Sequence, residues 1–387
     1  MDPALRLLRN LVAIDSVNPS LVPGAAGEAE IARAVANHLR QIGLDVEMQE
    51  VAPGRANVIG VLEGRGTGRS LMLCGHLDTV GVEGMSAPFD PVERDGRLYG
   101  RGAQDMKGGV AAKIDAARVI AQGTPGAPGG LAAGRLIVAA VVDEEYASIG
   151  ADALVTRWRA DGAVVTEPTD MQIAIGHKGF AWFEIETKGR AAHGSRPREG
   201  RDAILRMGRV LRELEALDRR LQAEPPHPLM GTASLHASII EGGRELSSYP
   251  DRCGLKLERR TVSGETQAGV TREIEDILAR LRDDDAGFEA SVTSLFARPP
   301  YEIAAHHDLP RALARARAPQ SPGASQPLVG MSFWTDAAVL GSAGIPSVLF
   351  GPGGAGLHSV EEYVEVQDVL RCRDALAALA RGWCVTE

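Results

Sequence analysis

The hydrophobic positions in the first part of the chain switch repeatedly between helical and strand-like spacing. From Glu28 to Gly43 apolar residues recur every three or four positions, which predicts an amphipathic helix ending at a glycine. Strand-like runs follow at 44–51, 57–63 and 70–75. A helix is expected from Lys107 to Gln122, and the run at 135–142 is apolar throughout, as in a strand covered on both faces. This alternation predicts an α/β domain with a mostly parallel sheet and helices on both faces.

The pattern changes near residue 178 and changes back after Pro299-Pro300. Between these points we expect a strand at 180–187, a helix at 201–222, strands at 233–240 and 254–260, a helix at 264–282 and a strand at 288–296. A β-α-β-β-α-β order predicts a ferredoxin-like α+β sheet with helices on one face. We therefore expect one large domain at 1–178 and 294–387, with a smaller domain inserted at 179–293. The Gly/Pro-rich stretch 123–134 is expected to be an exposed loop.

Composition narrows the class of protein. The 387 residues suit two domains, and the net charge of -9 comes from acidic and basic residues that are interspersed. Such a chain is not expected to bind nucleic acid or an anionic membrane surface. No apolar run approaches the length of a transmembrane helix, and the N-terminal residues lack the features of a signal peptide. The four cysteines have no paired spacing, which favours a reduced, cytoplasmic protein.

The segment GHLDTV (75–80) holds the first candidate for chemistry. His76 and Asp78 follow the apolar run 71–74, and residues two apart in a strand point to the same face. A carboxylate beside an imidazole at a strand end suits a metal site in which the carboxylate orients the histidine. A capped strand end with a satisfied histidine is the alternative.

Four more segments place acids or a histidine at turns or after predicted strands. Asp105 lies in the glycine-flanked turn of YGRGAQDMKGG, where a helix N-cap is the alternative. Glu144 and Glu145 follow a buried strand, and Glu167 follows a shorter one; a charged strand end is the alternative here. His358 comes after a glycine-rich loop whose amides could approach a ligand. Strand ends on one side of an open α/β sheet are where ligands bind.

Together these side chains offer two imidazoles and several carboxylates. Mixed nitrogen and oxygen ligands suit Zn²⁺, with Co²⁺ or Mn²⁺ as substitutes. The number suits two metal ions bridged by one carboxylate and a water molecule. A carboxylate that binds no metal is then available as general base, and the chemistry indicated is hydrolysis of an amide or ester.

The motifs HLDTV, GRGAQDMKGG, DEE, TEPT and GPGGAGLHSVEEYV occur in this order. In this arrangement the chain resembles the co-catalytic zinc aminoacylase/carboxypeptidase family over nearly its whole length. That family includes acetylornithine deacetylase, succinyl-diaminopimelate desuccinylase, aminoacylase and glutamate carboxypeptidase. The resemblance implies a metallohydrolase that cleaves the amide bond of small N-acyl amino acids, in the style of acetylornithine deacetylase. A dipeptidase or carboxypeptidase with the same centre is the alternative, and a non-catalytic binding protein is a third interpretation.

The resemblance also implies a set of metal ligands for two Zn²⁺ ions. One ion would be bound by His76 and Glu167, and the other by Glu145 and His358. Asp105 would bridge both ions, and the peptide bond that follows it, to Met106, would be cis.

Further roles are implied by the same resemblance. Glu144 would be the general base for a metal-bound hydroxide, and Asp78 would support His76. His193, in the inserted domain, would reach across a homodimer and stabilise the oxyanion; a surface-loop histidine is its alternative. Arg260 would bind the carboxylate of the substrate, with a structural salt bridge as the alternative.

The inserted domain as a whole resembles the dimerisation or lid domain of the family. The glycine-rich loop, with Gly353 and Gly354, is expected to add amide contacts to the substrate. Ser248, Glu258 and Met85 depart from the family pattern, and these departures bear on substrate choice rather than on the metal centre.

Overall fold

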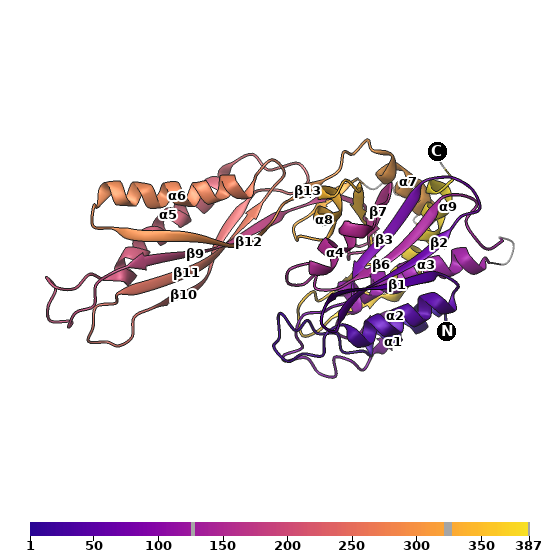
Figure 1. The fold of residues 1–387 in the computed structure, drawn as a ribbon, viewed down its shortest axis with the longest axis horizontal. Coiled ribbons are helices and arrows are strands. Elements are labelled where there is room, and N and C mark those ends of the chain that lie inside the picture. The colour runs from indigo at the N-terminus through magenta and orange to yellow at the C-terminus, as the bar shows by residue number, and fades with distance from the viewer. Residues whose placement is uncertain (125–127, 321–326, 386–387) are drawn as a thin grey trace. The chain divides into compact units, whose positions relative to one another are not determined.

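The computed structural model describes residues 1–124, 128–320 and 327–385. The chain forms two compact units (Figure 1). The first comprises Met1–Ile175, Ile303–Val329 and Thr335–Glu387, and the second comprises Gly176–Glu302 and Gly330–Trp334. Of the loop expected at 123–134, residues 125–127 lie outside the described part. None of the helices described has the length and hydropathy that a bilayer span requires.

A nine-stranded sheet lies mainly in the first unit, and its residues 176–177, 301–302 and 330–331 belong to the second. Its order is β1 (Asp45–Ala52), β2 (Arg55–Glu63), β6 (Arg135–Val141), β3 (Ser70–His76), β7 (Gly162–Val165), β15 (Ser347–Leu349), β8 (Ala174–His177) and β13 (Tyr301–Glu302), with β14 (Val329–Met331) paired to β8. The central strands β6, β3, β7 and β15 are parallel, which confirms the predicted type of sheet. The outer strands run antiparallel to their neighbours.

Helices cover both faces of this sheet, as the sequence predicts. They are α1 (Pro3–Val12), α2 (Ala29–Gln41), α3 (Gly108–Gln122), α4 (Ile149–Arg157), α7 (Asp308–Arg317), α8 (Ala337–Ser342) and α9 (Val366–Trp383). Gly60 of β2 faces Leu39 of α2 at a distance that leaves little room for a side chain. Asn57, on the opposite face of β2, donates to the carbonyl oxygen of Gly150 in α4 at 2.8 Å. Because successive side chains of a strand alternate, α2 and α4 lie on opposite faces.

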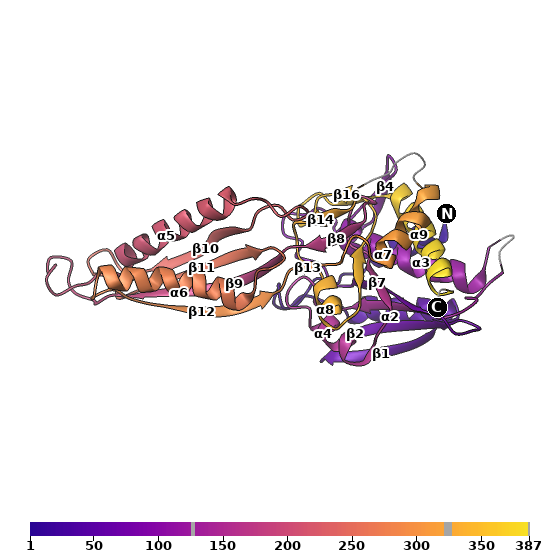
Figure 2. The ribbon, with the colours of Figure 1, turned by 90° about the horizontal axis from the view of Figure 1, so that it is seen from above.

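The second unit has the predicted β-α-β-β-α-β order. Its elements are β9 (Gly179–Lys188), α5 (Ala203–Ala223), β10 (Ser234–Gly242), β11 (Arg252–Thr261), α6 (Gln267–Asp284) and β12 (Glu289–Arg298). The sheet is antiparallel in the order β10-β11-β9-β12, and both helices pack on one face of it (Figure 2). Phe183 and Ile185 of β9 share this core with Leu214 of α5 and Ile277 of α6. β12 continues to Arg298, past the limit of 293 expected from the sequence.

A third, small sheet was not foreseen from the sequence. It contains β4 (Val92–Arg94), β5 (Arg97–Tyr99), β16 (Gly354–Ala355) and β17 (Tyr363–Glu365), in the order β16-β17-β5-β4. β5 leads directly into the turn that carries Asp105, and β16 and β17 flank His358. This sheet therefore brings two distant parts of the chain to the same place.

Candidate metal centre

Neighbouring parallel strands bring most of the predicted ligands together. His76 is the last residue of β3, Glu144 and Glu145 follow β6, and Glu167 follows β7. β6, β3 and β7 are adjacent and parallel, so their carboxyl ends meet at one edge of the sheet.

The first half of the cluster surrounds His76. Its Nε2 lies 3.1 Å from Asp105 Oδ1, and 4.0 Å from both Glu144 Oε2 and Glu167 Oε2. Its Nδ1 donates to the carbonyl oxygen of Asp78 at 3.0 Å. This hydrogen bond fixes the orientation of the ring and leaves Nε2 directed at the carboxylates.

The second half of the cluster surrounds His358, which is more exposed. Its Nε2 lies 3.1 Å from Glu145 Oε2 and 3.5 Å from Asp105 Oδ2. Asp105 therefore uses one carboxylate oxygen towards each imidazole, which is the arrangement expected of a bridging ligand. Ligand atoms of His76, Asp105 and Glu145 all lie within 4.8 Å of one another. The peptide bond between Asp105 and Met106 is cis, as the resemblance implies.

The pKa values reflect the burial of several acids side by side in this cluster. Burial, reinforced by the charge of Asp105, raises the pKa of Glu145 to about 7. Burial also raises the pKa values of Glu144 and Glu167 well above their usual range. Burial opposes ionisation of Asp105 as well, but hydrogen bonds from His358 and His76 lower its pKa.

The donor atoms of the cluster fit divalent metal ions. Glu145 Oε1 and Glu167 Oε1 are buried and have no hydrogen-bond partner among the described residues. Buried carboxylate oxygens in folded proteins nearly always have a partner. Carboxylate oxygens together with imidazole nitrogens are suitable ligands for Zn²⁺, Co²⁺ and Mn²⁺. Bound cations would satisfy these atoms and offset the concentrated negative charge.

Asp78 supports the cluster differently from the sequence-based expectation. Its carboxylate Oδ1 is 3.7 Å from His76 Nδ1, and it is the main-chain carbonyl of Asp78 that accepts from the imidazole. The carboxylate instead accepts the backbone N–H groups of Glu144 and Glu145, each at 3.1 Å. β3 ends at His76, so the alternation of a strand does not extend to Asp78.

Several supporting residues were not singled out from the sequence. Asn18 donates to Asp78 at 2.7 Å and to Asp143 at 3.1 Å, and Arg55 lies 2.8 Å from the Asp143 carboxylate. Asp336 is buried, and its charge contributes to the raised pKa values of the cluster carboxylates. Nothing in the sequence indicates that Asn18 contacts Asp78 and Asp143, because these residues are far apart in the chain.

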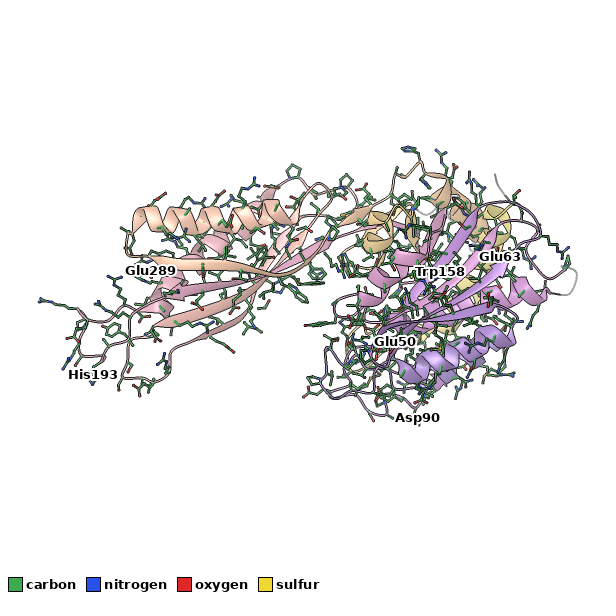
Figure 3. The ribbon with its side chains drawn as sticks, viewed as in Figure 1. Glu50, Glu63, Asp90, Trp158, His193 and Glu289 are labelled. Atoms are coloured by element: carbon green, nitrogen blue, oxygen red, sulfur yellow. The ribbon has the colours of Figure 1, made fainter. Side chains whose placement is uncertain are left out.

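His193 belongs to the second unit. His193 is labelled in Figure 3, at one end of that unit. Its Nδ1 is 2.8 Å from Ser195 Oγ. Its backbone forms an antiparallel bridge with Ser248. The side chain is exposed, so it is accessible to another molecule.

Arg260 also belongs to the second unit, and one of its guanidinium nitrogens is hydrogen-bonded within that unit. Its Nε donates to Glu258 at 2.7 Å, and the other oxygen of Glu258 accepts from Trp182 Nε1 at 2.8 Å. The guanidinium lies 5.5 Å from the centre of the Phe180 ring. Its two terminal nitrogens have no hydrogen-bond partner within the described part of the chain.

The glycine loop lies against the small sheet. The carbonyl oxygen of Gly353 accepts a hydrogen bond from the backbone N–H of Glu365 at 2.9 Å. Gly354 lies in β16, paired with Val364 of β17. The amide contact of Gly353 and Gly354 to a substrate stays a prediction.

The fold and the cluster suit a hydrolase that uses divalent metal ions. Comparison with known proteins supplies the family. The chain belongs to Peptidase family M20/M25/M40, whose family model matches residues 72–382.

Characterised relatives extend along nearly the entire chain. Acetylornithine deacetylase of Myxococcus xanthus is 32% identical and covers 99% of this chain and 98% of its own length. The N-formyl-4-amino-5-aminomethyl-2-methylpyrimidine deformylase of Bacillus subtilis is 30% identical, with 94% and 91% covered. A solved structure from Bacillus subtilis, described as a dinuclear metal-binding peptidase of family M20, is similar in fold. Its TM-score is 0.73 at 17% identity, and the match covers 99% of this chain and 98% of that one.

Proposed function

We propose that the protein hydrolyses the amide bond of small N-acyl amino acids, in the manner of a deacetylase. The observation that carries this proposal is the position of Glu144, a carboxylate with a side chain only 10% exposed, 4.0 Å from His76 Nε2 and with a raised pKa. Two relatives of about 30% identity remove a small acyl group from nitrogen, according to their names. A dipeptidase or carboxypeptidase would use the same centre and differ in its substrate pocket.

The residues that would hold two Zn²⁺ ions, with Co²⁺ or Mn²⁺ as substitutes, form two sets. His76 and Glu167 would serve one ion, Glu145 and His358 the other, and Asp105 would bridge them. Divalent ions in such a site lower the pKa of water and polarise the carbonyl oxygen of the substrate.

Glu144 is the proposed general base and general acid. It takes a proton from the attacking water as the new C–O bond forms, and it delivers this proton to the amide nitrogen as the C–N bond breaks. The products are a carboxylate and a free amine. A glutamate with a raised pKa suits both steps at near-neutral pH, because it can bind and release the proton.

Arg260 is the proposed receptor for the substrate carboxylate. Glu258 engages only its Nε, which leaves the two terminal nitrogens for a bidentate contact. The guanidinium is thus held in place before the substrate arrives. This arrangement favours substrates that carry a free carboxylate.

A homodimer is part of the proposal, with His193 stabilising the oxyanion in the partner's site. β10 is an edge strand of the second unit, and Ile239 and Ile240 on it are about half exposed, at 52% and 51%. An exposed apolar edge strand is a natural surface for pairing with a second copy. The four cysteines are all buried and unpaired, which suits a cytoplasmic location.

Replacement of Glu144 by alanine tests the proposed mechanism. The variant should lose several orders of magnitude in kcat, while the number of metal ions bound per chain stays unchanged. Retained turnover in a variant that binds metal normally would show that another group moves the proton.

A further inference from the structure

The carboxylate of Glu362 is fully buried and accepts four hydrogen bonds. Its donors are Arg101 Nη1 at 2.7 Å and the backbone N–H groups of Gly102, Gln104 and Asp105 at 3.0, 2.9 and 3.1 Å. The Glu362 side chain therefore fixes the backbone of the turn that ends at Asp105. The carboxylate of Asp105 lies between the imidazoles of His76 and His358.

Arg101 extends this contact to two further segments. Its Nε donates to the carbonyl oxygen of Gly81 at 3.1 Å, and its Nη2 donates to that of Ser359 at 2.9 Å. Gly81 belongs to the loop after GHLDTV, and Ser359 follows His358 directly. The guanidinium is only 3% exposed, so water cannot easily replace these contacts.

The pair thus connects three parts of the chain that carry candidate ligands. Arg101 stands four residues before Asp105, and Glu362 stands four residues after His358. A shift of either segment would move a carboxylate or an imidazole away from the shared cluster. Because Asp105 faces both imidazoles, a small rotation of its turn would affect both halves of the centre.

We propose that Glu362 and Arg101 are positioning residues of the metal centre, and that the affinity for metal depends on them. This inference rests on the proposed function. Neither side chain belongs to the ligand cluster. They act through the backbone of Asp105 and through the segment that bears His358, in the way that hydrogen-bonding partners beyond the ligands orient metal sites in general.

A neighbouring residue provides a matched control. Glu361 precedes Glu362, but its side chain is 73% exposed and, among the described residues, forms an ion pair only with Arg94, at 3.4 Å. A second control is Asp115, a buried carboxylate in α3 that pairs with Arg118 and lies outside the cluster. Asp115→Asn reports the general cost of neutralising a buried, paired acid.

The test measures metal binding rather than turnover. Metal-free wild-type protein and the variants Glu362→Gln, Glu361→Gln, Asp115→Asn and Arg101→Lys are titrated with Co²⁺ and followed by visible absorption. Glu362→Gln should bind Co²⁺ about 10–100-fold more weakly and show an altered spectrum. Arg101→Lys keeps the charge but cannot contact all three acceptors, so it should show a smaller loss in the same direction.

The two controls should keep wild-type Co²⁺ affinity, and Asp115→Asn should only lower the melting temperature. Wild-type affinity and spectrum in both Glu362→Gln and Arg101→Lys would overturn the inference and leave the proposed function intact. Failure of the wild-type protein itself to bind Co²⁺ would instead overturn the proposed function.

Discussion

The carboxylate of Asp78 accepts the backbone N–H of Glu144 at 3.1 Å, and its second oxygen accepts that of Glu145 at 3.1 Å. The end of β3 thereby holds the turn that follows β6. Asp143, which opens this turn, has a φ of 68°, in the left-handed region that aspartate tolerates better than most residues. The proposed base and a proposed ligand thus share a single anchor.

Asp78→Asn should reduce both catalysis and metal affinity. An asparagine offers one oxygen where two backbone N–H groups and the amide of Asn18 now donate, so its NH₂ group would face a donor. We expect a loss of about 10–100-fold in kcat at saturating metal, with a weaker Co²⁺ titration. A variant with wild-type kcat would show that the anchor does not orient Glu144.

Arg260→Lys should raise KM and leave kcat nearly unchanged. Lysine replaces a planar fork with a point charge and cannot make a bidentate contact to a carboxylate. We expect KM for an N-acetyl amino acid to rise by about tenfold or more. The contact to the carboxylate binds the ground state and the transition state equally, so its loss raises KM and leaves kcat unchanged. Glu258→Gln should show a smaller effect in the same direction.

The control for the Arg260 prediction is an N-acetylated amine that lacks a carboxylate. Its kinetic constants should be the same in wild-type protein and in Arg260→Lys. An equal loss for both substrates would mean that Arg260 is a structural residue.

Gly109→Ala should destabilise the first unit. A Cβ at Gly109 would collide with the carbonyl oxygen of Thr166, which immediately precedes Glu167. Gly208 lies in the middle of α5, and a Cβ there would meet nothing within 4 Å. Thermal unfolding should therefore show a loss of about 1–3 kcal/mol for Gly109→Ala and a gain of about 0.5–1 kcal/mol for Gly208→Ala. Equal effects of the two substitutions would contradict the close approach of α3 to β7.

His177 should make the stability of the second unit depend on acid. Burial lowers its pKa to about 4, and the ring lies 6.0 Å from the rings of both Tyr301 and Trp334. The unfolded chain binds a proton near pH 6.5 and the folded chain does so only near pH 4. Between these values the unfolded state holds more protons, so stability falls as the pH falls, by about 3 kcal/mol over the whole window.

Urea unfolding at several pH values, followed by tryptophan fluorescence, measures this dependence. His177→Phe keeps a ring of similar size and removes the titrating group. The difference between the two proteins should be constant above pH 6.5 and change steadily below it. Parallel curves down to pH 4 would show that His177 binds its proton at the same pH in the folded and the unfolded chain.

The candidate residues of the cluster could be picked out from the sequence because each lies at a recognisable buried strand end or glycine turn, while their roles as ligands remain a proposal. Glu144, Glu145 and Glu167 are acids directly after apolar runs, and parallel strands place such ends together. The inserted sheet could be predicted equally well from the sequence, because the alternation over 180–187 and the apolar faces of its two helices span many residues.

The supporting contacts could not be predicted in this way. The carboxylate of Glu362 contacts the amide of Asp105 across 257 residues of sequence, and Asn18 reaches Asp78 across 60. The small sheet that brings Glu362 to the turn is built from strands of two or three residues, which have no periodicity to detect. The contacts of the Asp78 carboxylate with the turn after β6 were not predicted, because β3 ends two residues earlier and the rule for alternating side chains no longer applies.

The most direct measurement is hydrolysis of N-acetyl, N-succinyl and N-formyl amino acids and of dipeptides by chelator-treated protein, with and without added Zn²⁺ or Co²⁺. The account predicts no turnover without metal and restored turnover with it, strongest for an N-acyl amino acid. Restored turnover of dipeptides alone would mean that the protein is a peptidase and not a deacylase. Turnover that is the same with and without metal, or absent despite two metal ions bound per chain, would contradict the central claim.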